Sequence, residues 1–350
     1  MNTPRRVLVV RLGAVGDVVR TLPAVGLLRQ AWPDARVAWA VETLSAPLLE
    51  GHPDIDRLLV LDRRRLQRQI RRLSPGAVGL LREFRRGLRD FSAELSLDFQ
   101  GSFKSGLVAA LSGAPLRFGF DRPWIREGSH LFANHRVRLD PARRHRVLRA
   151  AALVEAAGVP PGGRLAPNLV LGEDELERGR RERRRLCPEG AVVALAPFSS
   201  RRQAWKRYPL ERWKAIARGV TERGASLIVL GGPGEREPAE ALTAGAGERA
   251  AISTDLDLRE LAALIAACPV LVGGDTGPMH IAWSVGSRVV AIYGPTDPAL
   301  NAPFGEGHRV LAPERPTSRQ EADRFPGISP ERVIDSIFQV LETSTKETPP

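Results

Sequence analysis

The chain has 350 residues, of which 43% are hydrophobic, 26% are charged and 5% are aromatic. This composition is that of a folded globular protein and excludes a disordered or fibrous one, and the length predicts two domains because one core rarely organises so long a chain. The net charge of +12 indicates an anionic partner, which could be nucleic acid, a phosphorylated metabolite or a membrane surface.

The start of the chain and its two cysteines favour the cytoplasm. Residues Met1–Arg6 lead straight into the strand-like run Val7–Val10, and we find neither a signal peptide nor the roughly 20 consecutive apolar residues that cross a bilayer. Cys187 and Cys268 are too few for a disulfide framework and lack metal-ligand spacing, so we expect two unreactive thiols.

Short β-branched runs alternate with helix-length segments along the chain, which is typical of βαβ units with parallel sheets. The expected strands are Arg6–Val10, Arg36–Val41, Arg57–Leu61, Leu95–Phe99, Val192–Ala196, Leu227–Gly231, Val270–Gly273 and Arg288–Tyr293. The fold class expected is therefore α/β, with two Rossmann-like halves and a cleft between them.

A segment rich in Pro and Gly, Gly158–Pro167, separates the two series of strands. We expect one domain over 1–160 and a second over 161–330, with the boundary in this segment. Apolar residues at helical spacing predict that 331–350 begins as a helix packed on a domain and ends, after Thr343, as a loose tail.

Arginines crowd one part of the first half, with few aromatic side chains between them that could stack on bases. They are Arg63, Arg64, Arg65, Arg68, Arg71, Arg72, Arg82, Arg85, Arg86 and Arg89. A solvated helical face explains such a run as well as a contact with an anionic partner does.

The first candidate site follows the first expected strand. The loop Gly13–Asp17 stands between that strand and an apolar helical stripe, so it lies at a strand's carboxyl end, where open α/β sheets bind ligands. It contains G-x-x-G rather than G-x-G-x-x-G, so an NAD fingerprint is not supported. Asp17 is either a general base or the N-cap of the helix that follows.

Two further candidate loops follow strands of the second half. Pro197–Pro209 gathers hydroxyls and cations that suit a diphosphate, although an ordinary solvated loop has a similar composition. Leu230–Glu235 is a glycine-rich turn that a ligand can approach closely. Its carboxylate, Glu235, either binds ribose hydroxyls or is merely an acidic residue in the first turn of the next helix.

The strongest local signal is Gly273–His280, at the end of another strand. Asp275 or Thr276 can cap the next helix, with Pro278 in its first turn and backbone N–H groups left to bind a phosphate. His280 either contacts the ligand or is a satisfied helix histidine.

Metal chemistry has little support in the sequence. Asp54-Ile55-Asp56 and Asp255-Leu256-Asp257 fit an Asp-x-Asp pattern, but patterns of three residues arise by chance and turns favour Asp. The chain has no H-E-x-x-H, cysteine cluster, Walker loop or G-x-S-x-G elbow. We expect no metal and no other cofactor.

In their order and spacing these loops resemble the lipopolysaccharide heptosyltransferases of glycosyltransferase family 9, from about Arg6 to Phe304. Gly16–Ala24, Trp39–Glu42 and Asp98–Ser105 are similar to heptosyltransferase I more than to heptosyltransferase II. The resemblance implies a GT-B fold, with an acceptor-binding and a donor-binding Rossmann-like domain facing across a cleft.

The resemblance also implies site residues. Asp17 matches the family's catalytic base. The expected donor-binding residues are Ser199, Ser200, Lys206, Glu235, Leu256, Asp275, Thr276, Gly277 and His280. The expected acceptor-binding residues are Gly16, Arg63, Arg64, Gln100 and Lys104. The family often has Thr in place of the two serines and a different spacer before the lysine, so Arg201, Arg202 or Arg207 could take the same charge role.

The implied reaction is an inverting, metal-independent transfer of heptose from ADP-L-glycero-D-manno-heptose to the Kdo-lipid A inner core of lipopolysaccharide. The enzyme would be cytoplasmic and peripheral to the inner membrane, with its arginine-rich stretch facing the anionic leaflet. The alternatives are heptosyltransferase II or a related family 9 transferase that uses another nucleotide sugar. A basic nucleic-acid-binding protein is the alternative of another class.

Overall fold

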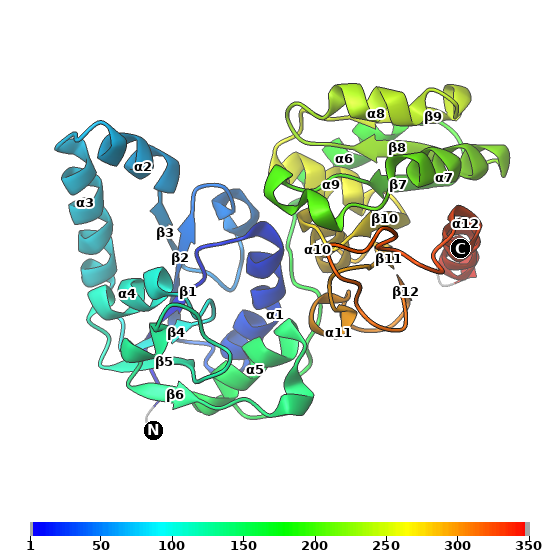
Figure 1. Ribbon diagram of the computed structural model, residues 1–350. Helices are drawn as coiled ribbons and strands as arrows, with labels where there is room; N and C mark the ends of the chain where they lie inside the picture. The colour runs from blue at the N-terminus through cyan, green and yellow to red at the C-terminus, as the bar shows by residue number, and fades with distance from the viewer. Residues whose placement is uncertain (1–2, 347–350) are drawn as a thin grey trace. The chain divides into compact units, whose positions relative to one another are not determined.

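The computed structural model describes residues 3–346, and the chain divides into two compact units, Met1–Val170 and Leu171–Pro350. Each unit is a parallel six-stranded sheet covered by helices (Figure 1). No helix among the described residues is both long enough and apolar enough to cross a bilayer.

The first unit has its strands in the order β3-β2-β1-β4-β5-β6. They are β1 (Arg6–Val10), β2 (Arg36–Glu42), β3 (Arg57–Leu61), β4 (Leu95–Asp98), β5 (Leu116–Phe120) and β6 (His135–Val137). β1 is buried from its second residue onward, as expected for a central strand covered on both faces. The chain winds outward from β1 in both directions, so the carboxyl ends of β1 and β4 form the point where such sheets bind ligands.

Helices cover both faces of the first sheet (Figure 1). The helices α1 (Val15–Ala31) and α5 (Arg146–Ala156) pack together on one face. On the other face α3 (Gly76–Phe91) packs on α4 (Phe103–Ser112), and α2 (Arg63–Arg71) packs on α3. α2 has no buried residue, so most of the arginine-rich stretch is solvated helix surface.

The second unit repeats this plan, with the order β12-β11-β10-β7-β8-β9. Its strands are β7 (Val192–Ala196), β8 (Ser226–Leu230), β9 (Ala250–Ser253), β10 (Val270–Gly274), β11 (Arg288–Ile292) and β12 (Arg309–Leu311). Ala196, the last residue of β7, pairs in register with Gly273 of β10. The loops that follow β7 and β10 therefore leave the sheet side by side.

One face of the second sheet carries α6, α9 and α10, and the other carries α7, α8 and α12 (Figure 1). The bounds are Glu173–Leu186 for α6, Leu210–Glu222 for α7, Arg236–Thr243 for α8, Leu258–Ala266 for α9, Gly277–Ser284 for α10 and Pro330–Lys346 for α12. Val333 and Ile337 of α12 join the hydrophobic core, as the helical spacing predicted. The helix continues past Thr343, and the rest of the expected loose tail, 347–350, lies outside the described residues.

Both cysteines are buried and free, as expected from their number and spacing. Burial raises the pKa of the Cys268 thiol to about 12, so this thiol stays protonated at physiological pH. Burial also raises the pKa of Cys187.

Gly179 lets α6 and α9 pack closely. A Cβ at this position would overlap the backbone carbonyl of Ala263 in α9, and a backbone carbonyl cannot swing aside as a flexible side chain can. We expect Gly179→Ala to lower the free energy of unfolding by about 1–3 kcal/mol, although alanine favours helix. Urea unfolding followed by tryptophan fluorescence measures this loss.

The control is Gly79→Ala in α3, where an added Cβ has open space, and it is expected to be neutral or stabilising by up to about 1 kcal/mol. Equal unfolding midpoints for the two variants would contradict the close packing of α6 on α9.

Candidate functional site

Asp17 lies in a cluster of arginines at the start of α1. The N-cap of α1 is Ala14, so the interpretation of Asp17 as N-cap is wrong and its side chain is available for other contacts. Its Oδ2 lies 2.5 Å from Nη2 of Arg11, at the end of β1. Its Oδ1 lies 2.5 Å from Nη2 of Arg20 and 3.0 Å from Nη1 of Arg146, in α5.

The charge of this cluster determines the protonation state of Asp17. Burial alone would raise the pKa of the carboxyl, but the guanidinium groups of Arg11, Arg20 and Arg146 outweigh burial and hold that pKa well below its usual range. Asp17 is therefore ionised at physiological pH. About a fifth of its side chain is exposed, so a substrate hydroxyl can reach it.

The loop after β4 is tied to the loop after β1. Asp98 accepts hydrogen bonds from the N–H groups of Gln100 and Gly101, at 3.0 and 3.1 Å. Nη1 of Arg11 donates to the carbonyl of Phe99 at 2.6 Å, and the N–H of Leu12 donates to Oε1 of Gln100 at 3.0 Å. These bonds hold Gln100 beside the arginine cluster.

A small cavity of about 50 Å³ opens on Asp17, within the first unit. It is lined by Arg11, Asp17, Arg20, Thr21, Phe99, Gln100, Phe120, Arg146, Arg149 and Ala150. The sequence reasoning missed all four arginines. Two signals could have indicated three of them: Arg11 directly follows a buried strand, and Arg146 and Arg149 stand three residues apart on one helix face.

Of the acceptor residues expected from sequence, Gln100 lines this cavity, and Gly16 is buried in α1 next to Asp17. Arg63 and Arg64 are in the first turn of α2, where Nη1 of Arg63 lies 3.5 Å from Oε1 of Glu42. Arg64 is exposed, as is Lys104 near the start of α4. These three cations are not among the residues that line the cavity.

In the second unit, Lys206 and Asp275 meet at the carboxyl ends of β7 and β10. Nζ of Lys206 donates to the backbone carbonyl of Asp275 and lies 3.6 Å from its Oδ2. Nε2 of His280 is 3.2 Å from Oδ1 of Asp275, and Nδ2 of Asn301 donates to Oδ2 at 3.4 Å. The side chains of Lys206 and Asp275 are each about nine-tenths buried. His280 is thus part of this group through Asp275.

Thr276 is the N-cap of α10, and Pro278 is in the helix's first turn. The Thr276 side chain makes no capping bond, because its Oγ1 donates to the carbonyl of Gly274 at 3.3 Å instead. The Thr276 side chain therefore does not occupy the first-turn N–H groups, and such a helix start suits a phosphate. Gly277 is the first residue of this turn.

Arg207 joins two of the other expected donor residues. Its Nη2 lies 3.2 Å from Oε1 of Glu235, and its Nε donates to Oγ of Ser199 at 3.2 Å. Glu235 is the N-cap residue of α8, and its Oε2 accepts the N–H of Gly232 at 2.8 Å. Its carboxylate folds back over the glycine turn. Ser200 is exposed, as are Arg201 and Arg202.

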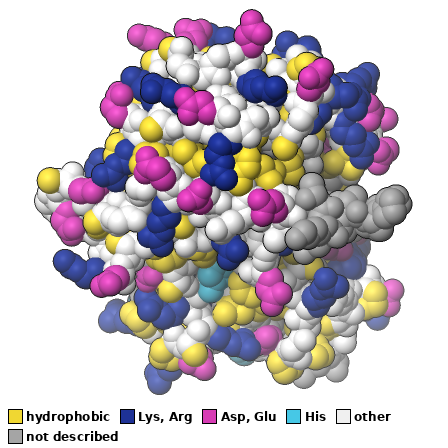
Figure 2. Space-filling view, turned by 90° about the vertical axis from the view of Figure 1, so that its right-hand side faces the viewer, with side chains coloured by type: hydrophobic (Ala, Val, Ile, Leu, Met, Phe, Trp, Pro, Cys, Tyr) yellow, Lys and Arg dark blue, Asp and Glu magenta, His cyan; other side chains and the backbone are white. Residues whose placement is uncertain are grey.

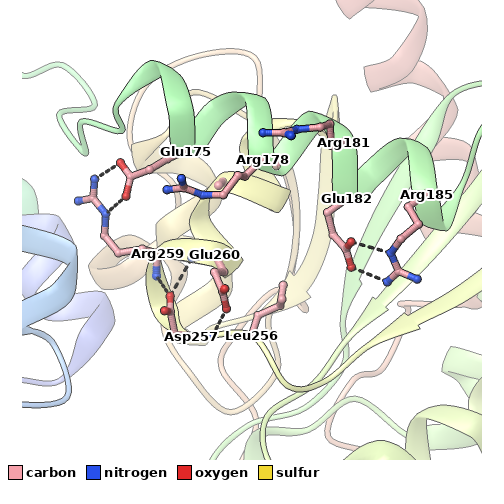
Figure 3. Close-up of a pocket in the computed structure, with 11 residues that line it drawn as sticks. Glu175, Arg178, Arg181, Glu182, Arg185, Leu256, Asp257, Arg259 and Glu260 are labelled. Atoms are coloured by element: carbon pink, nitrogen blue, oxygen red, sulfur yellow. Dashed lines mark hydrogen bonds and ion pairs between the residues drawn. The ribbon is translucent and has the colours of Figure 1, made fainter.

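Leu256 lines a groove of about 820 Å³ between α6 and the loop that leads into α9 (Figure 3). The groove is lined by Glu175, Arg178, Gly179, Arg181, Glu182, Arg185, Leu256, Asp257, Arg259, Glu260 and Ala263. In Figure 3 Glu175 and Arg259 pair across the two helices, and Glu182 pairs with Arg185 along α6. Leu256, the expected adenine contact, is therefore a half-buried residue on the lining of a charged groove.

The Asp-x-Asp pairs have structural partners. Oδ2 of Asp56 lies 2.9 Å from Nη2 of Arg29, and Asp54 accepts a hydrogen bond from Asn168. Asp255 pairs with Arg236, and Asp257 caps α9. Within residues 3–346, no group of three or more His, Cys, Asp or Glu side chains is arranged to hold a metal ion.

The family model "Glycosyltransferase family 9 (heptosyltransferase)" matches residues 81–326. The chain belongs to this family and is a glycosyltransferase. Lipopolysaccharide heptosyltransferase 1 of Pseudomonas aeruginosa is 29% identical, covering 89% of this chain and 84% of that protein. Lipopolysaccharide heptosyltransferase 2 of Salmonella typhimurium is 24% identical, covering 96% of this chain and 98% of that protein.

The solved structures confirm the expected GT-B fold. The family 9 glycosyl transferase from Veillonella parvula matches with a TM-score of 0.81 and 22% identity, over 97% of either chain. E. coli heptosyltransferase WaaC with ADP matches with a TM-score of 0.77 and 23% identity, over 97% of this chain and 99% of that one.

The buried carboxyl of Asp98 gives the first unit a pH-dependent stability. Burial raises its pKa to about 6, against the donated hydrogen bonds of Gly101, Ser105 and Gln100. The folded chain therefore takes up a proton below pH 6, whereas the unfolded chain does so only near its ordinary pKa of about 4. This difference stabilises the folded chain as the pH falls from 7 to 5.

We expect Asp98→Asn, which cannot titrate, to lose this gain. We compare the free energy of unfolding of the unsubstituted chain with that of the variant at each pH. The advantage of the unsubstituted chain over the variant should be about 1 kcal/mol larger at pH 5 than at pH 7. Urea unfolding at the two pH values measures it, with exposed Asp34→Asn as control. The same stability difference at both pH values would contradict the raised pKa.

Proposed function

We propose that this protein transfers heptose from ADP-L-glycero-D-manno-heptose to the Kdo-lipid A inner core of lipopolysaccharide, with inversion and without a metal. The observation that carries the proposal is Asp17, an ionised carboxylate on a small cavity at the sheet's ligand-binding point. Membership of the heptosyltransferase family and relatives named as lipopolysaccharide heptosyltransferases support the donor and acceptor classes.

Asp17 is proposed as the general base. The acceptor hydroxyl must lose its proton as it attacks the anomeric carbon, and an ionised carboxylate at hydrogen-bonding distance can take it. Because the surrounding arginines keep the pKa of Asp17 low, the carboxylate is a weak base. Such a base suffices if the proton leaves late, when the sugar already has oxocarbenium character and the hydroxyl has become acidic.

The second unit is proposed as the donor site. The departing ADP gains negative charge, which Lys206 and the N–H groups at Thr276 and Gly277 would stabilise where other transferases use a metal. Asp275 would keep Lys206 and His280 in place. The remaining contacts are proposed from Ser199 and Ser200 to the diphosphate, from Glu235 to the ribose and from Leu256 to the adenine.

The first unit is proposed as the acceptor side. Gly16 and Gln100 lie next to Asp17, while Arg63, Arg64 and Lys104 would meet the phosphorylated lipid. The arginines of α2 and α3 would face the anionic inner leaflet of the membrane, and the enzyme would then lie at the cytoplasmic surface. Some segments of the first half are similar to heptosyltransferase I. This similarity favours Kdo-lipid A as the acceptor over the acceptor of heptosyltransferase II.

On one face of the molecule the charges do not suit nucleic acid. A nucleic-acid binder needs a continuous basic surface. On the face shown in Figure 2, acidic and basic side chains are interspersed, so the positive charge does not gather there. Three cations of the candidate site instead surround one carboxylate, since Arg11, Arg20 and Arg146 all pair with Asp17.

The base assignment predicts the effect of Asp17→Asn. Turnover with ADP-heptose and Kdo-lipid A should fall by about a thousandfold or more, because the amide cannot accept the proton, while ADP binding is unchanged. Release of ADP measures turnover, in parallel assays with and without chelator. The exposed Asp34→Asn should keep full activity. Normal turnover by Asp17→Asn would contradict the base, and loss of activity in chelator would contradict a metal-free reaction.

The donor site predicts selective binding of ADP. Calorimetric titration of ADP, UDP, GDP and a DNA duplex should show the tightest binding for ADP. Asp275→Ala should weaken ADP binding roughly tenfold or more, because Lys206 loses the carboxylate that holds it. Asp335→Ala, an exposed change on α12, is the matched control. Duplex binding without nucleotide selectivity would favour the nucleic-acid alternative.

A further inference from the structure

The cavity beside Asp17 has an excess of positive charge. Its lining contains four cations, Arg11, Arg20, Arg146 and Arg149, against one anion, Asp17, which leaves an excess of three positive charges. The side chains of Arg11 and Arg20 are each only 8% exposed, so water screens little of this charge. Such a concentration of guanidinium groups is stable only with anions close by.

Several donors in this cavity also lack an acceptor. The Nε atoms of Arg11, Arg146 and Arg149 are buried and have no hydrogen-bond partner among the described residues. Buried donors of this kind are rare in folded proteins. Three of them on the lining of one cavity indicate that something with acceptor atoms completes the site.

Arg149 is the clearest member of this set. Its guanidinium lies over the ring of Trp124, 4.7 Å from the centroid, and donates one hydrogen bond of 3.4 Å to the Trp124 carbonyl. Burial, together with the charges of Arg146 and Arg11, lowers the pKa of Arg149 to about 10, which still leaves it charged at neutral pH. No carboxylate of the described residues is bonded to it.

Arg146 and Arg149 lie three residues apart on α5, so both guanidinium groups can reach one ligand. We propose that this cavity binds a carboxylate of the acceptor sugar between Arg146 and Arg149, and that the bound carboxylate draws Arg146 away from Asp17. This inference rests on the proposed function, in which the acceptor Kdo is an acid sugar. A cavity of about 50 Å³ holds a group of carboxylate size, and guanidinium forks bind carboxylates through paired hydrogen bonds.

The consequence is a base that the correct acceptor activates. Three cations hold Asp17 before the acceptor binds: Arg11 from the end of β1, Arg20 from α1 and Arg146 from α5. When Arg146 turns to the acceptor carboxylate, two remain, and the new negative charge nearby further favours protonation of Asp17. An acceptor without a carboxylate would therefore bind weakly and also react slowly.

The binding half of the proposal is tested without turnover. Free Kdo and its carboxamide are titrated calorimetrically into the unsubstituted chain, Arg149→Met, and Arg138→Met as an exposed control in the same unit. We expect the unsubstituted chain to bind Kdo at least tenfold more tightly than the amide. In Arg149→Met the affinity for Kdo should fall by about the same factor, whereas the affinity for the amide should not change. No Kdo binding, equal binding of both ligands, or an equal loss for both in Arg149→Met would overturn the carboxylate site.

The activation half is tested with Kdo-lipid A and with the same acceptor carrying Kdo carboxamide. With Kdo-lipid A, we expect the kcat/KM of Arg146→Met to be at least tenfold lower than that of the unsubstituted chain. With the carboxamide acceptor, the kcat of Arg146→Met should equal or exceed that of the unsubstituted chain. Circular dichroism confirms that the variant is folded. A similar fall in kcat for both acceptors would show that Arg146 is merely structural. If Kdo binds selectively but the unsubstituted chain transfers no heptose, the proposed function fails and the carboxylate site stands.

Discussion

The ion-pair cluster around Asp17 is the constraint on which the candidate site of the first unit depends. It joins β1 through Arg11, α1 through Arg20 and α5 through Arg146, so it forms only when α1 and α5 pack on the same face of the sheet. Burying so many charges costs stability that apolar side chains would not. Under the proposed function, these charges serve the chemistry at Asp17.

Both units place their site residues by the same means. Parallel strands that wind outward from a central pair leave two neighbouring loops at their carboxyl ends. In the first unit these loops bring Arg11 to the carbonyl of Phe99, and in the second they bring Lys206 to Asp275. Each pair joins residues far apart in the chain, so the sheet order, rather than local sequence, makes the contact.

The central strands could be predicted from sequence because both of their faces are covered, and a strand such as β7 is therefore apolar throughout. The edge strand β3 was predicted at Arg57–Leu61, but the edge strands β6, β9 and β12 were not, nor was β5, which lies next to β6. β5 contains Arg117 and Gly119, and β6 is three residues long with its first two exposed. β9 and β12 are also short and partly exposed. Edge strands need fewer apolar residues, so their composition does not distinguish them from loops.

The same limit applies to the site. Glycine and aspartate after a strand indicate a ligand loop locally, which is why the sequence predicted Asp17 and Asp275. The sequence around Arg146 has the pattern of an ordinary amphipathic helix. Arg146 is also 129 residues from Asp17 in the chain. The spacing of Arg146 and Arg149 indicates a shared helix face, but the contact of Arg146 with Asp17 depends on helix packing that no local pattern encodes. Yet Arg146 helps to determine how strongly Asp17 holds a proton. Sequence therefore locates the proposed base, whereas only the folded unit determines how strongly it holds a proton.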